Sequence, residues 1–301
     1  MEYRAGRDQA GTLRALRHEF ESDPPIGKKI LKIARVISVT SGKGGVGKTI
    51  CVANLAITMA RLGYRILVID ADLGLANIDL YFGLNPKFNL NHFFAGEKEL
   101  PEIFIQAAEG IMVLPAGSGV QKYTHLDSSQ KIRLMEGLEL LQDQFDVVLI
   151  DTEAGISENV TYFNVAAQQI VVMTTPEPTA ISDAYALMKL LSTRYYEKNF
   201  KLIVNSVASE SEALDVYHKL TLVSSRFTDF SIDFLGAIPL DKRFPDSVRK
   251  QKTLVELFPG TKPSLAFADL VKNLDLKSEM RVPKGSPQFF WKGLLSSTET
   301  R

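Results

Sequence analysis

Nine residues near the start of the chain constrain its fold more than any other feature. Residues 41–49 read Ser-Gly-Lys-Gly-Gly-Val-Gly-Lys-Thr and stand between a short β-rich run and an amphipathic helical pattern. Gly42, Gly47, Lys48 and Thr49 satisfy the G-x-x-x-x-G-K-T spacing of a phosphate-binding loop in the strand-then-helix context that such a loop requires. The glycines allow backbone N–H groups to converge on phosphate oxygens, and the helix presents its positive N-terminus to them. The motif predicts that Lys48 reaches the β- and γ-phosphates and that the Thr49 hydroxyl ligates Mg²⁺.

Apolar runs alternate with amphipathic helical patterns along most of the chain. Continuously apolar runs are typical of parallel strands that helices cover on both faces. The strand candidates are residues 36–40, 66–70, 111–114, 147–151, 170–174, 202–205 and 234–238, and the helix candidates are 50–62, 128–144, 180–196, 210–227 and 263–273. We therefore predict an α/β fold, a doubly wound, mostly parallel sheet with helices on both faces.

Composition limits the number of domains and the compartment. The 301 residues, 45% hydrophobic and 23% charged, fit one large α/β domain with extensions, or two small domains. We predict a leader over 1–34, a phosphate-loop domain over 35–276 and a tail over 277–301. The single Cys51 excludes an internal disulfide, favours a reducing compartment, and falls in the helix after the loop, where we expect it in the core. With neither a signal segment nor a spanning apolar run, we expect a cytoplasmic protein whose membrane contact is peripheral.

A second lysine, Lys43, lies inside the phosphate loop. Residues 43–49 resemble the deviant Walker A motif of the MinD/ParA class of ATPases. The resemblance implies ATP and Mg²⁺ as cofactors, ATP hydrolysis, and a homodimer in the ATP state, in which Lys43 reaches the nucleotide of the partner subunit and stabilises transferring charge as an arginine finger does. The residues that it places around the nucleotide are Gly42, Lys43, Gly44, Gly45, Val46, Gly47, Lys48, Thr49 and Ile50.

Three carboxylates follow strand candidates. Asp70 and Asp72 end the second strand, and Asp151 ends the fourth in a Walker B pattern, where it would hold Mg²⁺ through water. By the resemblance, Asp72 positions the attacking water and Asp70 lies near the Mg²⁺ shell; the alternative is a pair of solvated loop acids. Glu153 departs from the D-T-G-A-G pattern of the class, where a glycine stands. It could weaken triphosphate binding, slow hydrolysis or point outward, and the sequence does not choose among these.

Base recognition rests on two segments. Asn205 ends an apolar run and matches the asparagine that contacts adenine in the class, although asparagine at a strand end is often a turn former. Residues 236–241, Gly-Ala-Ile-Pro-Leu-Asp, match a segment of the class that lies beside the base. We therefore assign Pro239 and Asp241 to the nucleotide site together with Asn205.

Two features resemble the flagellar group of the class (FlhG, also called FleN or YlxH). Residues 7–14 resemble its N-terminal D-Q-A-x-x-L-R motif, which stimulates the GTPase of the signal-recognition-type protein FlhF, and residues 174–185 resemble its T-P-E-P-T-A-I-x-D-A-Y run. The motif implies partner-activating roles for Asp8, Gln9, Ala10, Leu13 and Arg14. Gln9 could orient water and Arg14 could meet phosphate charge. An ordinary amphipathic helix is the alternative.

The tail concentrates apolar side chains beside lysines. These side chains are Phe289, Phe290, Trp291, Leu294 and Leu295. Members of the class commonly carry a C-terminal amphipathic helix that targets an anionic membrane surface, but Gly293 interrupts this one. A tail packed on the domain is the alternative.

The resemblance therefore implies an ATP-hydrolysing, homodimerising switch that regulates flagellar number or placement. Its implied partners are an FlhF-type GTPase and flagellar switch (C-ring) proteins or a flagellar transcription regulator. A MinD-like division-site ATPase and a ParA-like partition ATPase are the alternatives. Lys plus Arg equal Asp plus Glu at 35 each, which speaks weakly against the DNA binding of the latter. A metabolic enzyme related to nitrogenase iron proteins would need cluster-binding cysteines, and Cys51 alone does not supply them.

Overall fold

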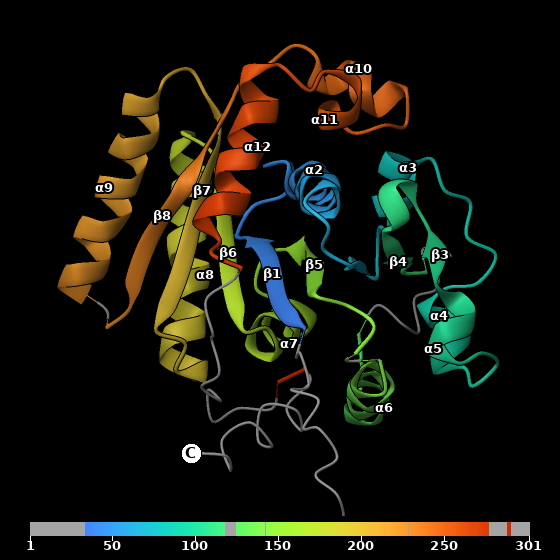
Figure 1. Ribbon diagram of the computed structural model, residues 1–301. Coiled ribbons are helices and arrows are strands. Elements are labelled where there is room, and N and C mark those ends of the chain that lie inside the picture. The colour runs from blue at the N-terminus through green and yellow to red at the C-terminus, as the bar shows by residue number, and fades with distance from the viewer. Residues whose placement is uncertain (1–33, 118–124, 142, 228, 277–287, 290–301) are drawn as a thin grey trace, which may run out of the picture. The chain divides into compact units, whose positions relative to one another are not determined.

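In the part of the chain that the structure describes, eight strands form a single sheet (Figure 1). The computed structural model describes residues 34–117, 125–141, 143–227, 229–276 and 288–289. Within these ranges the strands are β1 (Arg35–Ser41), β2 (Ile66–Ala71), β3 (Ile105–Gln106), β4 (Met112–Leu114), β5 (Val147–Ala154), β6 (Gln169–Thr174), β7 (Asn199–Val207) and β8 (Ser231–Pro239). Their order is β3-β4-β2-β5-β1-β6-β7-β8, and only the β3–β4 pair is antiparallel. The predicted mostly parallel sheet is confirmed.

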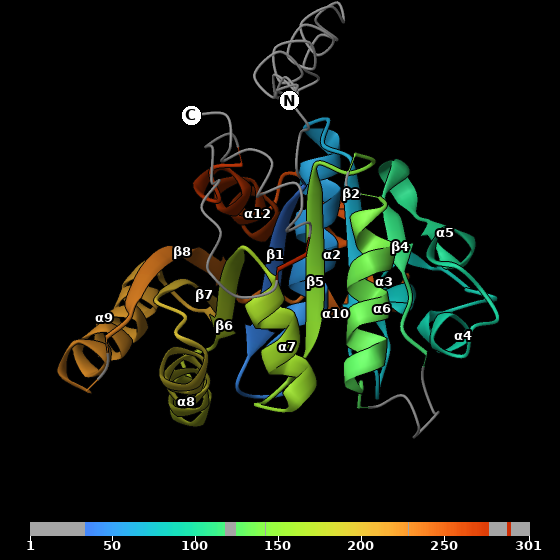
Figure 2. The same cartoon turned by 90° about the horizontal axis from the view of Figure 1, so that it is seen from below.

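Helices cover both faces of the sheet, as predicted. They are α2 (Lys48–Arg61), α3 (Ile78–Phe82), α4 (Leu90–Phe94), α5 (Leu100–Ile103), α6 (Ser128–Glu139), α7 (Glu158–Ala166), α8 (Pro178–Tyr195), α9 (Glu210–Phe227), α10 (Phe244–Arg249), α11 (Leu254–Leu257) and α12 (Lys262–Asn273), with a 3₁₀ turn at Ala108–Gly110. The helices α2, α11 and α12 share one hydrophobic cluster with the sheet, whereas α6 to α9 pack on the opposite face (Figure 2). Across the described part of the chain, no helix has both the length and the apolar composition needed to cross a bilayer.

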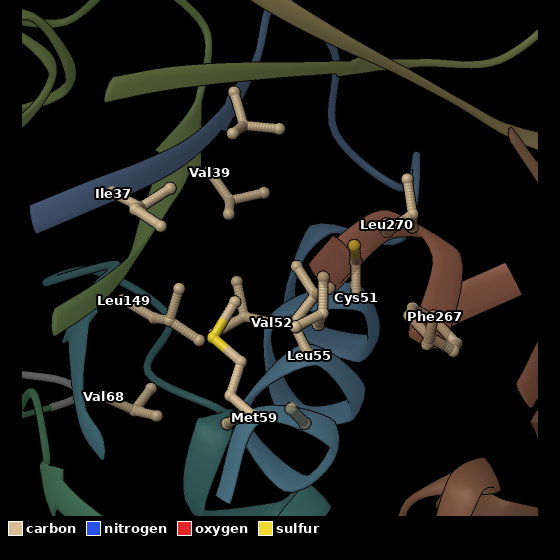
Figure 3. Close-up of a cluster of buried hydrophobic side chains, with 14 of the residues drawn as sticks. Ile37, Val39, Cys51, Val52, Leu55, Met59, Val68, Leu149, Phe267 and Leu270 are labelled. Atoms are coloured by element: carbon tan, nitrogen blue, oxygen red, sulfur yellow. The ribbon is translucent and has the colours of Figure 1, made fainter. Parts of the chain in front are cut away.

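The phosphate loop is anchored by the burial of the helix that follows it. Two alternate residues of β1, Ile37 and Val39, pack in the same cluster as α2, whereas Val36 packs in the cluster on the opposite face of the sheet. Strand β1 is therefore buried along its whole length. Figure 3 shows Val52, Leu55 and Met59 of α2 against strands β1, β2 and β5, with Phe267 and Leu270 of α12 on the far side of the helix. Because α2 is apolar on two sides, its first turn is held firmly at the carboxyl end of β1.

Cys51 belongs to this same cluster. Its side chain is 1% exposed, and burial raises the pKa of its thiol far above the ordinary value. A thiol in this environment stays protonated and unreactive. The prediction that Cys51 is a core residue is confirmed.

Helix α7 is the largest element that the sequence patterns missed. Its polar residues Asn159 and Asn164 are buried, so it lacks the exposed polar stripe from which an amphipathic helix is recognised. Asn164 accepts a hydrogen bond from Ser38 at 2.8 Å and donates one to Thr40 at 3.1 Å, so its amide ties α7 to β1. Helix α6 also ends at Glu139, earlier than the predicted 144.

Phe289 lies in the core, although the tail around it was predicted to face a membrane. Its side chain is fully buried against Tyr162 and Phe163 of α7, with ring centroids 6.0 and 6.4 Å away. Its backbone N–H donates to the carbonyl of Ala166 at 3.0 Å. At this residue the packed alternative therefore holds. The other four apolar residues of the tail lie outside the described residues.

We expect Phe289→Ala to lower the free energy of unfolding by about 3 kcal/mol, because it leaves a cavity beside the rings of Tyr162 and Phe163. Chemical denaturation followed by circular dichroism measures the change. Leu140→Ala is the matched control, since Leu140 is 85% exposed and its truncation should change stability by less than about 0.5 kcal/mol. Equal effects of the two substitutions would contradict the packing of Phe289.

Candidate active site

The phosphate loop connects the carboxyl end of β1 to the start of α2. Gly47 has a φ of +94°, which favours glycine, and a Cβ there would lie 2.6 Å from the side-chain nitrogen of Asn205. At the other end of the loop, a Cβ on Gly42 would collide with the carbonyl oxygen of Asp183 in α8. Both motif glycines are thus required, because other residues of the same chain lie too close to leave space for a side chain.

The first turn of α2 is available to an anion. No side chain caps this 14-residue helix at Gly47, and no acidic residue lies in its first turn. Its first N–H groups therefore combine with the positive end of the helix dipole at the mouth of the loop. The site has the backbone donors that a phosphate group requires.

Lys48 is a buried cation that already has polar partners. Its ammonium donates to the Ser41 hydroxyl at 3.0 Å, and Ser41 in turn donates to the carbonyl of Lys43 at 2.7 Å. Burial lowers the pKa of Lys48, and the negative charges of Asp151, Asp72 and Glu153 oppose that effect. These contacts and charges hold the Lys48 ammonium among carboxylates at the end of the sheet.

Asp151 and Thr49 meet as the metal-binding prediction requires. Asp151 is 1% exposed, and burial raises its pKa to about 7, while the hydrogen bond from Thr49 and the charge of Lys48 act in the opposite direction. Among the described residues, the Oδ1 atom of Asp151 is one of few buried side-chain atoms without a hydrogen-bond partner. A buried carboxylate oxygen without a partner, beside a hydroxyl, fits Mg²⁺, which keeps several waters and phosphate oxygens as further ligands.

Asp70 organises the loop after β2. It is paired in register with Asp151 on the neighbouring strand β5. Its carboxylate accepts backbone N–H groups from Asp72 at 3.1 Å, Asn77 at 3.1 Å and Ile78 at 3.2 Å. Burial and the charge of Asp151 raise the pKa of Asp70, whereas the amide hydrogen bonds lower it. The contacts give Asp70 a loop-holding function, and its place near the Mg²⁺ shell stays a prediction.

Asp72 lies at the mouth of the site. Its Oδ1 atom accepts the backbone N–H of Leu75 at 2.8 Å, and its side chain is only partly exposed. The charge of Asp72 acts on both Lys48 and Asp151. This location is compatible with the predicted water-positioning role, which stays a prediction.

Lys43 contacts its own chain in this structure. Its ammonium lies 2.5 Å from the carboxylate of Glu177 and 2.7 Å from the hydroxyl of Thr179. Glu177 precedes the first residue of α8 and is part of the run 174–185. Sequence reasoning did not pair the two, although the unusual Thr-Pro-Glu-Pro-Thr segment was the signal that could have suggested it.

The residues predicted to contact the base lie together at the ends of β7 and β8. The side-chain nitrogen of Asn205 donates to the carbonyl of Val46 at 2.8 Å, so in this structure the amide supports the phosphate loop. Pro239 pairs with Val207 in the neighbouring strand. Asp241 is bound by Arg243 through contacts of 2.7 and 2.8 Å, and these hydrogen bonds lower its pKa. The base contacts themselves stay predictions.

Glu153 is held beside the site by a serine that sequence reasoning missed. The Ser157 hydroxyl donates to Glu153, and the same oxygen accepts the N–H of Val160 at 3.2 Å, so Ser157 also caps α7. A serine before an acidic first turn was the available signal.

All five predicted partner-activating residues lie outside the described part of the chain: Asp8, Gln9, Ala10, Leu13 and Arg14.

The raised pKa of Asp151 leads to a prediction about stability. Its folded-state value of about 7 exceeds the ordinary 3.8, so the folded chain binds this proton more tightly than the unfolded chain. That contribution is complete below the ordinary value and is lost as the pH rises through the folded one. At pH 8, without nucleotide or Mg²⁺, Asp151→Asn should therefore be more stable than the wild type, by on the order of 2 kcal/mol.

Urea unfolding at pH 8 and at pH 5 measures this difference, which should shrink at the lower pH. Asp229→Asn is the control, because the Asp229 side chain is 97% exposed and should change stability little. An advantage of Asp151→Asn that is larger at pH 5 than at pH 8 would contradict the assignment.

Comparison with known proteins agrees with this geometry. The profile of a family described as an AAA domain matches residues 34–204. Antiactivator FleN of Pseudomonas aeruginosa is 39% identical over 266 residues, which cover 88% of this chain and 95% of FleN. The flagellum site-determining protein YlxH of Helicobacter pylori is 34% identical over 265 residues, 87% of this chain and 90% of YlxH.

Solved structures share the fold of this chain. The MinD cell division protein of Aquifex aeolicus superposes with a TM-score of 0.68 at 25% identity, over 83% of this chain and 99% of that one. The septum site-determining protein MinD of Pyrococcus horikoshii, complexed with Mg-ADP, superposes with a TM-score of 0.64 at 24% identity, over 81% and 96% of the two chains, and shows the shared fold. The chain therefore belongs to the MinD/ParA class of deviant Walker A ATPases, in the group of FleN and YlxH, and is an enzyme that hydrolyses ATP.

Proposed function

We propose that this protein is a nucleotide-controlled switch that regulates flagellar number or placement, dimerising with Mg²⁺–ATP and returning to monomers on hydrolysis. Relatives named antiactivator FleN and flagellum site-determining protein YlxH match most of the chain. The observation that carries the proposal is the contact of Lys43 with Glu177, because it joins the extra lysine of the ATPase motif to the run that resembles the flagellar group.

The contact suggests how one lysine could serve two states. Lys43 and Glu177 are both partly exposed, with side-chain exposures of 33% and 55%. Ion pairs of this kind contribute little to stability, so the lysine can exchange one anionic partner for another. In the monomer it binds Glu177 and Thr179; in the dimer it would reach the phosphates of the partner subunit and stabilise the charge that develops there.

Within one subunit, the remaining site residues divide the chemistry. Lys48 and the first turn of α2 would hold the phosphates, and Thr49 with Asp151 would hold Mg²⁺, which supplies charge neutralisation when bound. Asp72 would orient the attacking water. Asp70 would act indirectly, because its carboxylate holds the loop that carries Asp72.

We expect Lys43→Ala to reduce ATP hydrolysis by about two orders of magnitude or more while sparing nucleotide binding by the monomer, since the missing cation acts in the dimer. Multi-angle light scattering with a non-hydrolysable ATP analogue should show dimers for the wild type and monomers for the variant. Lys198→Ala, which removes a similarly exposed lysine paired with Asp229, is the matched control. A wild type that stays monomeric at high protein concentration would refute the switch.

The companion change Asp72→Ala should trap the ATP dimer, because the group that orients water is gone while phosphate binding remains. A normal rate of hydrolysis in this variant would remove Asp72 from the mechanism.

We also propose that the leader stimulates an FlhF-type GTPase. Residues 1–20 should accelerate single-turnover GTP hydrolysis by such a partner, and Gln9→Ala or Arg14→Ala should reduce the stimulation at least roughly threefold, because the motif supplies an amide and a cation to a phosphoryl-transfer site. Arg17→Ala, a basic residue outside the motif, is the control. Absence of stimulation at saturating leader would favour a MinD-like role instead.

Peripheral binding to the cytoplasmic face of an anionic membrane completes the proposal. A single short amphipathic segment binds lipid weakly, and two in an ATP dimer would bind through avidity. Sedimentation with anionic vesicles should therefore depend on ATP.

Flagellar switch proteins or a flagellar transcription regulator are further proposed partners, which co-purification from a flagellated cell would test. Salt-sensitive binding to duplex DNA without vesicle binding would favour the partition alternative.

A further inference from the structure

Glu153 occupies a position of unusual electrostatic importance. It lies next to the end of β5, the strand that carries Asp151, and β5 stands between β1 and β2 in the sheet. The register that pairs Ala154 with Ser41 brings this strand end to the start of the phosphate loop. An ideal Cβ on Gly44, inside that loop, would make ordinary contact with Ala154 at 3.9 Å. An acidic side chain at this point adds negative charge where a polyphosphate must bind.

Two contacts keep the carboxylate in place. The Ser157 hydroxyl donates to its Oε1 atom, and this hydroxyl is itself fixed by its bond to the N–H of Val160. Between the two side chains the backbone turns through Gly155, whose φ is +102° and whose N–H donates to the carbonyl of Ser41 at 2.9 Å. The segment from Glu153 to Ser157 is thus closed on itself and bonded to the loop.

The charges around Lys48 are already in excess. Asp72, Asp151 and Glu153 act on this one ammonium, while the other lysine of the loop, Lys43, is bonded to Glu177. ATP differs from ADP by the γ-phosphate and its added negative charge, and the phosphate-loop lysine is the group that meets it. A carboxylate in this field therefore opposes the triphosphate more strongly than the diphosphate.

We propose that Glu153 is a nucleotide-selectivity residue, whose carboxylate, held beside the phosphate loop by Ser157, disfavours the γ-phosphate and shifts the preference of the monomer from ATP toward ADP. The inference rests on the assignment of the site to an adenine nucleotide. Its consequence is that a higher ATP concentration is needed before dimers form. Asp151 and Asp72 are not assigned this role, because the proposed function gives them to Mg²⁺ and to the attacking water.

The test compares the full-length wild type with Glu153→Gln, which removes the charge but keeps an oxygen for the Ser157 hydroxyl. Isothermal titration with ADP and with AMP-PNP, both with Mg²⁺ and at two protein concentrations, separates binding from dimer formation. We expect the affinity for AMP-PNP relative to ADP to rise about tenfold, which corresponds to about 1.4 kcal/mol. Glu153→Gly, which places the residue of the similar motif here, should give the same direction and serves if Glu153→Gln folds poorly.

Two further variants separate charge from structure. Glu158→Gln removes a neighbouring negative charge whose side chain is 84% exposed, and it should leave the ratio of affinities unchanged. Ser157→Ala should lower the melting temperature through the lost helix cap. If Glu153 served only that cap, Glu153→Gln would lower the melting temperature and leave the ratio within twofold of the wild type, which would overturn the proposal. ADP binding reports separately on the site: a wild type that binds neither nucleotide overturns the site assignment and the inference together.

Discussion

The burial of one ammonium group among carboxylates governs the arrangement of the whole site. Lys48 loses hydration at the end of the sheet, and Asp151, Asp72 and Glu153 compensate its charge. The compensation is itself unbalanced, because Asp70 and Asp151 lie opposite each other on neighbouring strands and each is buried. Burial raises the pKa of both carboxylates, and the charge of Asp151 raises that of Asp70 further.

Three hydrogen bonds to backbone carbonyls tie β1 and the phosphate loop to neighbouring segments. The amide of Asn205 reaches across from β7 to the carbonyl of Val46, the N–H of Gly155 bonds to Ser41, and the Thr152 hydroxyl donates to the carbonyl of Val39 at 3.1 Å. The first contact comes from β7, the second from the residue that follows β5 and the third from β5 itself, and all three end on β1 or its loop. Movement of any one of these segments would therefore shift the phosphate loop as well.

Local sequence patterns predicted the features that residues close together in the chain define. They missed the contacts between residues that are distant in sequence. The loop between β1 and α2, and the carboxylate that ends β5, were predictable because spacing and burial along one element define them. The bond of Lys43 to Glu177 joins residues far apart in the chain, and no periodicity contains it. Helix α7 was missed because its asparagines look solvated in sequence, yet Asn164 bonds to Ser38 and Thr40. The burial of Phe289 was not predictable from the tail alone, because the rings that surround it belong to α7, which is distant in sequence.

The cost of gathering like charges is met by packing elsewhere. The phosphate loop itself buries few apolar side chains, Val46 being one, so its shape depends on the elements at its two ends. Helix α2 buries Val52, Leu55 and Met59 in the central cluster, and full burial of such side chains stabilises a fold by roughly 1.5–3 kcal/mol each. That stabilisation exceeds the penalty expected from a buried carboxylate whose pKa is raised to about 7. The packing of α2 behind the loop therefore lets the fold keep several carboxylates close together around Lys48.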